Sequence, residues 1–217
     1  MDGNGRWAQQ RALSRTKGHE AGAETIREIT TYCAQNKEIE TATFYAFSTE
    51  NWKRPKLEVE FLMKLLDTYL KNELETYMDN GIRLQVIGDT TAFSKSLQKR
   101  IKQTEYQTKN NANLIQILAL NYGGRAEITS AVNTLISEGK TILSEEDIST
   151  ALQTPYADID LLVRTSGEER ISNFLLWQLS YAEFHFTQTL WPDFTANELN
   201  EIVQNYKTRT RRFGGVK

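Results

Sequence analysis

The sequence predicts a single α/β domain, built on a central, mostly parallel sheet of about six strands with helices on its faces. Short β-rich segments alternate with longer segments of helical periodicity, which is the pattern of parallel β-α-β units. No Pro- or Ser-rich linker divides the 217 residues. Hydrophobic residues make up 39% of the chain and charged residues 25%, as is usual for a globular protein. We therefore expect one domain over residues 1–217.

In the first half of the chain, apolar residues recur at spacings of three and four from Gly18 to Asn36, which predicts a helix. The β-rich segment 41–47 predicts a strand. A broad apolar stripe after Pro55 predicts one long amphipathic helix that reaches residue 78 and ends near Gly81. A strand over 82–87 and a charged helix over 94–109 follow.

In the second half, residues 114–120 predict a strand and residues 125–137 a helix. Ser144 and Asp147 form a capping box that predicts a short helix over 144–152. A strand over 160–163, an apolar helix over 173–181, a brief strand over 184–186 and a final helix over 196–212 complete the expected order.

Three polar segments each follow a predicted strand, namely 47–55, 121–125 and 164–172. Because ligands of parallel sheets bind at the carboxyl ends of the strands, we expect these segments to line one rim. The first loop, around Asp2, joins the same rim if a strand precedes it. We therefore expect the native protein to have several more residues upstream of Met1.

The first seven residues suggest a loop that binds a metal and phosphate. Asp2 supplies a hard oxygen ligand of the kind that Mg²⁺ prefers, usually shared with substrate phosphates. Gly3 and Gly5 let the backbone turn sharply and approach a ligand. Arg6 adds a permanent cation with a fork of donors that fits phosphate oxygens. The alternative is a glycine-rich turn before a helix.

A second cationic loop contains Arg164, Arg170 and Ser172. Two arginines six residues apart in a loop can converge on one diphosphate, and Ser172 is expected to cap the following helix. The alternative is a surface loop with solvated arginines. The loop around Trp52 is polar apart from that one aromatic ring, and we expect it to be a mobile lid over the substrates.

Five ordered motifs carry a family resemblance: DGNGR at 2–6, YAFSTENWKRP at 45–55, NYGGR at 121–125, RTSGEERISNF at 164–174 and WPDF at 191–194. In this order they resemble the cis-prenyltransferases, most of all the bacterial undecaprenyl diphosphate synthases. The resemblance runs from Asp2 to the closing residues 211–215. It implies condensation of isopentenyl diphosphate with an allylic diphosphate such as farnesyl diphosphate. The implied product is a long-chain polyprenyl diphosphate, undecaprenyl diphosphate for the cell-wall lipid carrier.

The same resemblance implies roles for individual residues. Asp2 and Asn51 are the implied catalytic residues, with Asn51 taking part in proton removal. Asp2 and Glu183 are the implied ligands of Mg²⁺. The implied substrate contacts are those of Gly3, Asn4, Gly5, Arg6, Trp7, Arg15, His19, Ser48, Thr49, Glu50, Trp52, Arg54, Arg164, Arg170, Ile171 and Ser172.

Within this set, the resemblance assigns Arg164, Arg170 and Ser172 to isopentenyl diphosphate. It assigns Arg6, Arg15 and His19, with the backbone of residues 3–5, to the allylic diphosphate. An apolar tunnel lined by segments 57–78 and 114–120 would hold the growing chain. The closing motif at 212–214 implies a homodimer. Glu169 departs from the family, because a histidine stands there in some relatives.

Composition narrows the other possibilities. A formal net charge of −2 argues against a nucleic-acid-binding protein. A single cysteine, Cys33, excludes an internal disulfide and suits the cytoplasm. No segment is long and apolar enough to cross a membrane, so a long lipid product would be held in a protein cavity or handed to a membrane from outside, through a peripheral contact. No DDxxD motif of the trans-prenyltransferases occurs.

Three alternatives stay open from the sequence. The first is a cis-prenyltransferase with a shorter or longer product. The second is a non-catalytic subunit that binds prenyl diphosphates. The third is a phosphate-binding hydrolase, which the lack of an evident nucleophile with a paired base disfavours.

Overall fold

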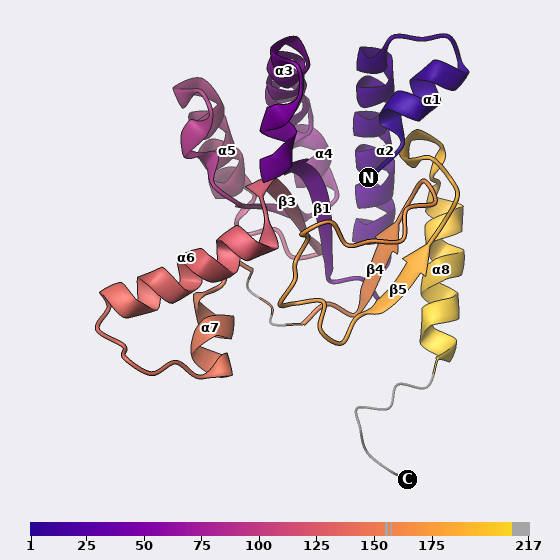
Figure 1. Ribbon diagram of the computed structural model, residues 1–217. Helices are drawn as coiled ribbons and strands as arrows, with labels where there is room; N and C mark the ends of the chain where they lie inside the picture. The colour runs from indigo at the N-terminus through magenta and orange to yellow at the C-terminus, as the bar shows by residue number, and fades with distance from the viewer. Residues whose placement is uncertain (155, 157, 210–217) are drawn as a thin grey trace.

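The computed structural model describes residues 1–154, 156 and 158–209 (Figure 1). Its central sheet has three parallel strands in the order β1-β3-β2, which are β1 (Thr41–Ser48), β3 (Leu114–Tyr122) and β2 (Ile82–Ile87). A separate parallel pair is formed by β4 (Leu161–Arg164) and β5 (Glu183–Phe186). All five strands lie within two residues of the strands expected from the sequence.

The expected single sheet of about six strands is wrong for the described residues, which form three strands and a separate pair. Side chains, and not a backbone ladder, connect the two sheets. Leu161 and Val163 of β4 pack against the same apolar core as Phe44 of β1. Burial of one shared core therefore holds β4 and β5 beside β1 without hydrogen bonds between the sheets.

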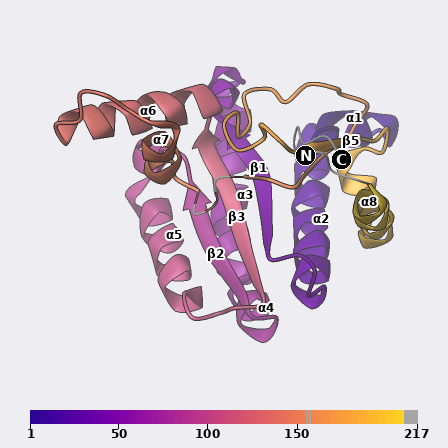
Figure 2. The same cartoon turned by 90° about the horizontal axis from the view of Figure 1, so that it is seen from below.

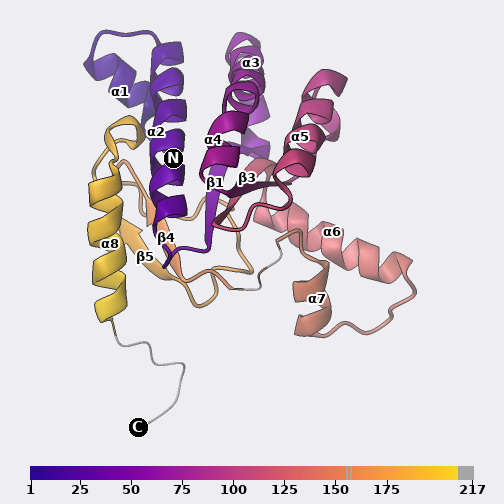
Figure 3. The ribbon, with the colours of Figure 1, turned by 180° about the vertical axis from the view of Figure 1, so that it is seen from behind.

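One face of the central sheet is covered by α2 (Arg15–Gln35), α3 (Lys56–Asn72), α4 (Leu74–Asp79) and α5 (Lys95–Thr108). Figure 3 shows these helices in front of the strands. Leu114, Leu118 and Leu120 of β3 point to this side, while Ile117 and Ala119 join a second core on the other face. Alternation along β3 thus buries both faces of the strand.

The second face is covered by an irregular segment, and the apolar helix expected over 173–181 is wrong. Ser172, Asn173 and Leu175 have φ angles of 47°, 63° and 40°, and the segment runs as turns. Left-handed backbone at three of four consecutive residues prevents a right-handed helix. Its apolar residues nevertheless pack onto Ile117 and Ala119 in the second core. The pattern correctly indicated burial but not the backbone conformation.

The long helix expected from residue 55 to 78 is interrupted at Glu73. This residue ends α3 and precedes α4, and it is 0% exposed. Its carboxylate accepts a 2.6 Å hydrogen bond from Nε of Arg27 on α2. A buried carboxylate is stable only when it is paired, so the break lies where α2 can supply a cation.

The remaining helices surround this layered core. Figure 2 shows α6 (Gly124–Ser137) and α7 (Glu145–Ala151) at the other side of the strands from α2, and α8 (Ala196–Thr208) beside α2. The capping box of Ser144 and Asp147 at the start of α7 is confirmed. The short α1 (Asn4–Gln10) was not expected from periodicity. The last residues expected in the final helix, 210–212, and the closing motif lie outside the described residues.

None of the described helices combines the length and the apolar character that a membrane span requires.

Candidate functional site

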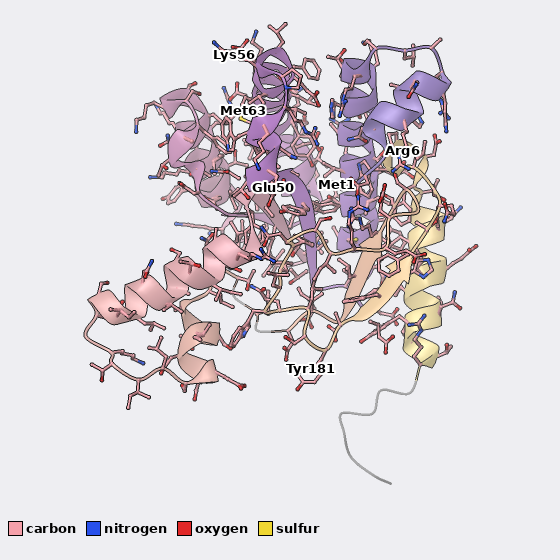
Figure 4. The ribbon with its side chains drawn as sticks, viewed as in Figure 1. Met1, Arg6, Glu50, Lys56, Met63 and Tyr181 are labelled. Carbon is pink, nitrogen blue, oxygen red and sulfur yellow. The ribbon has the colours of Figure 1, made fainter. Side chains whose placement is uncertain are left out.

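The segments that follow β1, β3 and β4 meet at one edge of the molecule, together with the N-terminal loop (Figure 4). A hollow of about 640 Å³ opens there. Its walls come from the N-terminal loop, α1, the start of α2 and the segment before α3. The lining residues are Met1, Asp2, Gly3, Asn4, Gly5, Arg6, Gln9, Ala12, Leu13, Arg15, His19 and Arg54. Of the three segments expected to line the rim, only 47–55 contributes to this lining, through Arg54.

Asp2 is fixed at the end of β4. Its Oδ2 accepts hydrogen bonds from Nε and Nη2 of Arg164 at 3.0 and 2.7 Å. Its backbone N–H donates to the hydroxyl of Thr165 at 3.1 Å, and its carbonyl accepts from the N–H of Trp191 at 2.9 Å. Two charged donors on one carboxylate oxygen hold its orientation strongly. The structure thus brings together the first loop and the cationic loop, which are more than 160 positions apart.

The cationic loop brings Arg164 and Ser172 into contact, while Arg170 pairs with Glu168. The Nη1 of Arg164 donates to Oγ of Ser172 at 3.0 Å, and the Arg164 side chain is only 12% exposed. Glu168 pairs with Arg170 and, at 3.4 Å, with Arg6. We call Arg164, Arg170 and Ser172, with Asp2 and Glu168, the clamp. The expectation that Ser172 caps a helix is wrong, because no helix begins there and its φ is 47°.

A second cationic group surrounds Glu58 on α3. One oxygen of this carboxylate, Oε1, contacts Nε of Arg15 at 3.1 Å, Nε2 of His19 at 3.3 Å and Nη1 of Arg54 at 2.9 Å. We call these four residues the Glu58 cluster. The Glu58 side chain is 13% exposed and that of His19 is 8% exposed, whereas Arg15 is 60% exposed, so only the carboxylate and the imidazole are largely shielded from water.

Burial lowers the pKa of His19 from its usual 6.5, and the hydrogen bond and charge of Glu58 oppose this shift only in part. The imidazole is therefore neutral near pH 7. It can then donate one hydrogen bond to Glu58 without adding a charge to the cluster. The permanent cations on this side of the hollow are the two arginines, Arg15 and Arg54.

The loop after β1 forms a short 3₁₀ turn over Thr49–Lys53. The Oδ1 of Asn51 accepts a hydrogen bond from the N–H of Ser48 at 3.1 Å, so this amide helps to close its own turn. The indole of Trp52 packs edge-on against Phe47 and donates to Oδ1 of Asn121 at 2.8 Å. The loop is thereby tied to the ends of both β1 and β3.

Glu50 and Asn173 connect this turn to the clamp loop. The Nδ2 of Asn173 donates to Oε1 of Glu50 at 3.2 Å (Figure 4 labels Glu50). The carbonyl of Asn173 accepts from the N–H of Gly124 at the start of α6. Gly123 allows this approach, since a Cβ there would lie 2.7 Å from the Asn173 amide and 3.0 Å from the Thr49 hydroxyl. Three strand ends are thus joined by side chains around one site.

The N-terminal side of the hollow depends on close packing between backbone segments. Gly3 has φ 109°, which only glycine adopts readily. A Cβ on Gly18 would lie 2.0 Å from the carbonyl of Asn4, so α2 can approach the first loop only because that residue is glycine. Asn4 Oδ1 and Ser166 Oγ are buried and have no hydrogen-bond partner among the described residues. Buried polar atoms of this kind suit a polar ligand.

A small apolar pocket of about 110 Å³ adjoins the hollow. Met1, Asn4 and His19 border both spaces. The walls of the pocket come from β1, β3 and the facing sides of α2 and α3, and include Ala23, Ile26, Ala46, Leu62, Met63, Leu66, Tyr69 and Leu118. A charged hollow that continues into an apolar pocket fits a ligand with an anionic head and an apolar tail.

Some residues expected in the site lie elsewhere. Trp7 donates from Nε1 to Asp193 at 2.6 Å, and Arg11 stacks on its ring at 4.3 Å, so Trp7 anchors α1 to the segment after β5. Ile171 packs against the second core. His185 lies in β5 opposite Val163, as expected of a structural residue.

Glu183 is not brought to Asp2 within this chain. It opens β5 opposite Leu161, whereas Asp2 is bound at Thr165 beyond the end of β4. About four strand positions therefore separate Glu183 from Asp2, which corresponds to roughly 13 Å. Two ligands of one Mg²⁺ ion, each about 2.1 Å from it, would lie much closer to each other. Glu183 instead pairs with Arg209 at 2.6 Å. No group of three or more acidic, His or Cys side chains within the described residues forms a metal cage.

Sequence reasoning missed two carboxylates. Glu58 lies four residues after Arg54 on α3, and this helical spacing was its only signal. Glu168 lies inside the cationic loop, where the sequence drew attention only to the arginines and Ser172, and it joins Arg6 to Arg170. In both cases the carboxylate holds at least one arginine that lines the hollow, namely Arg6 for Glu168 and Arg15 and Arg54 for Glu58.

Comparison with known proteins agrees with this geometry. The family model described as putative undecaprenyl diphosphate synthase matches residues 1–214. An isoprenyl transferase of Wolinella succinogenes is 54% identical over 217 residues, with 100% of this chain and 94% of the relative covered. An isoprenyl transferase of Fusobacterium nucleatum is 50% identical at the same coverage.

Two solved structures are also similar. Lavandulyl diphosphate synthase from Lavandula x intermedia, in complex with dimethylallyl diphosphate, has a TM-score of 0.93 at 33% identity and covers 99% of this chain and 95% of its own. A probable undecaprenyl diphosphate synthase from Campylobacter jejuni has a TM-score of 0.83 at 38% identity, with 90% and 92% covered. The expected resemblance is confirmed: this chain belongs to the isoprenyl transferase family of undecaprenyl diphosphate synthases.

Proposed function

We propose that this protein is a Mg²⁺-dependent cis-prenyltransferase that condenses isopentenyl diphosphate with an allylic diphosphate. The observation that carries the proposal is a hollow lined by Arg6, Arg15 and Arg54, joined through Asp2 to the clamp, with an apolar pocket next to it. The reaction needs two diphosphate heads and one apolar tail at a single place. The solved relative that holds dimethylallyl diphosphate supports an allylic diphosphate as one of the two substrates.

The two groups suit different substrates. Arg6, Arg15 and Arg54 line the hollow, and His19 borders both the hollow and the apolar pocket, so this side suits the allylic diphosphate, whose tail then enters the pocket. The clamp suits isopentenyl diphosphate, because Arg164 and Arg170 offer planar forks of donors and Ser172 a hydroxyl. Binding both heads at one mouth places the reacting carbons together, which accounts for much of the rate gain in such reactions.

Asp2 is the residue that we propose for Mg²⁺. Both hydrogen bonds from Arg164 go to Oδ2, and no described residue donates to Oδ1. A single carboxylate oxygen together with substrate phosphates and water is a common magnesium environment. When bound, the ion neutralises charge on a diphosphate. The predicted role of Glu183 gains no support from its place at the far end of β5.

The protein residues then have these tasks. Arg6 and the arginines of the Glu58 cluster stabilise the negative charge that grows on the departing allylic diphosphate, while the clamp arginines hold isopentenyl diphosphate. The apolar walls receive the tail and exclude water from the allylic carbon, which gains cationic character. Asn51 lies in the turn between the two groups, where its Nδ2 can orient substrate while its Oδ1 holds the turn. A proton leaves isopentenyl diphosphate as the new cis double bond forms.

For the product we propose a long-chain polyprenyl diphosphate, undecaprenyl diphosphate for the cell-wall lipid carrier, made by a cytoplasmic homodimer. The apolar pocket between α2 and α3 would receive the first part of the growing chain. A different product length is the alternative.

Incubation with farnesyl diphosphate, labelled isopentenyl diphosphate and Mg²⁺, followed by chromatography, tests the proposal. We expect a ladder of products whose longest member gives the chain length. Asp2→Ala should abolish turnover, and Asp79→Ala, at the exposed end of α4, should retain it. Full activity of Asp2→Ala would contradict the assigned roles. No incorporation by the native chain would favour a non-catalytic, prenyl-binding subunit.

A further inference from the structure

One end of the molecule is formed by the loop between α1 and α2 and by the segment that leads into α3. Figures 1 and 3 show both at the same extreme of the molecule, and Figure 4 labels Lys56 there. We call residues 11–17 and 53–57 the outer rim. The hollow opens beside it, since Leu13, Arg15 and Arg54 line its wall.

The outer rim is strongly cationic. Its twelve residues include six Lys or Arg and no acid, whereas the whole chain has two more acidic than basic residues. Five of the six rim cations pair with four acids outside the rim, which are Glu20, Glu58, Glu60 and Asp193. Counting these acids still leaves a positive excess. The Lys56 side chain is 90% exposed. A concentrated positive charge on an acidic protein attracts anionic surfaces.

The same rim exposes two large apolar side chains. Leu57 is 80% exposed and Leu13 is 45% exposed. Every residue of segment 11–15 is exposed as well. A single exposed leucine is ordinary. Two exposed leucines among six cations form the combination of apolar and basic side chains that partitions into a membrane interface.

We propose that the outer rim docks on the surface of a membrane that contains anionic lipids. The cations would lie at the lipid head groups, and Leu13 and Leu57 would enter the interface. In this orientation the hollow and the apolar pocket behind it open toward the bilayer. The docking itself does not depend on the proposed function. Only its purpose rests on that function, since a product with a long apolar tail could pass into lipid without crossing water.

Vesicle flotation with purified full-length protein tests the docking. We expect binding to vesicles of phosphatidylcholine and phosphatidylglycerol, little binding to phosphatidylcholine alone, and weaker binding as salt rises, because the attraction is screened. Each basic residue near an anionic surface contributes roughly a fivefold change in affinity, so Lys56→Glu, a change of two charges, should weaken binding roughly 25-fold. Leu57→Ser should weaken it about tenfold.

Matched controls lie far from the rim. Lys37→Glu reverses an exposed charge at the other end of α2, and Ile142→Ser removes an apolar side chain that is 88% exposed between α6 and α7. Both should bind vesicles like the native protein. Equal binding to neutral and anionic vesicles, no binding to either, or equal losses in rim and control variants would overturn the proposal.

Two further measurements separate the possible causes. Size-exclusion chromatography shows whether Leu57→Ser changes the oligomeric state, and such a change would mean that a second copy of the chain covers the rim, which also overturns the proposal. Prenyl transfer in detergent, without vesicles, is measured for every variant. Loss of docking with unchanged transfer supports the rim's role, whereas docking by a chain without transfer activity would overturn the proposed function alone.

Discussion

The two cationic groups of the hollow are built in opposite ways. The clamp is carried by the loop after β4, where Ser166 has φ 78° and Ser172 has φ 47°, and its carboxylates are partly open to water, with Asp2 45% and Glu168 27% exposed. The Glu58 cluster is carried mainly by helices, and its carboxylate is 13% exposed. In both groups, carboxylates hold the arginines apart and oriented in the absence of a ligand.

This difference indicates different responses to a diphosphate. An exposed ion pair contributes little to stability, so the pairs of Glu168 with Arg6 and Arg170 can be exchanged for phosphate contacts at small cost. Glu58 is more deeply buried and would be left as an uncompensated charge if its cations moved away. We infer that the clamp rearranges around its substrate while the Glu58 cluster stays preformed.

The largest effect is expected for Asp2→Asn. The amide loses the negative charge that the proposed Mg²⁺ needs and leaves Arg164 without its carboxylate partner. We expect kcat/KM to fall by about a thousandfold or more, in line with the loss of several kcal/mol of electrostatic stabilisation. Steady-state kinetics at several Mg²⁺ concentrations measures it, with Asp79→Asn as the control. A variant whose Mg²⁺ dependence matches that of the native protein would remove Asp2 from the metal site.

Arg164→Lys should be the next most severe change. One ammonium cannot donate twice to Asp2 and once to Ser172, so the charge is kept but the geometry is lost. We expect kcat/KM to fall about a hundredfold, mainly through isopentenyl diphosphate. The exposed Arg125→Lys on α6 is the matched control. If Arg164→Lys changes only the KM of the allylic substrate, the two diphosphate assignments must be exchanged.

Sequence reasoning located the strands well because each is a short β-rich segment between turn signals, as in 82–87 and 114–120. It did not show which strands pair, since the pairing of β4 with β5 alone depends on packing between distant segments. Sequence reasoning also expected a helix at 173–181. This segment instead contains left-handed turns, but its apolar residues are buried as those of a helix would be. The break at Glu73 depends on Arg27, 46 positions away.

The sequence likewise predicted some residues of the site and missed others. Residues with distinctive chemistry, such as Asp2, Arg164 and Ser172, were expected at one rim and are found there. The carboxylates that hold them were missed, because an acid near an arginine in sequence is most often a surface ion pair. Trp7 was expected to contact substrate, but its partner Asp193 lies near the other end of the chain.

Glu58→Gln tests whether the second group is preformed. The amide keeps the shape but removes the charge that holds Arg15 and Arg54, so we expect the KM of the allylic substrate to rise about tenfold with a smaller change in kcat. The pKa of His19 should fall further, because Glu58 raises it in the native protein. Kinetics and NMR titration of the imidazole measure the two effects. Glu60→Gln, an exposed neighbour on α3, should change neither.

The smallest effect is a pH dependence of stability that we expect from His19 of the Glu58 cluster. Burial lowers the pKa of His19 in the folded state below its usual 6.5, so the unfolded chain binds this proton more readily. The free energy of unfolding should therefore decrease as the pH falls below about 6.5, by about 1.4 kcal/mol for each unit of the pKa shift. Denaturant unfolding between pH 5 and 8 measures it, and His19→Gln should flatten this part of the curve while His185→Gln leaves it unchanged. If both variants follow the native curve, His19 does not titrate differently on folding, and the cluster is more open to water than its burial implies.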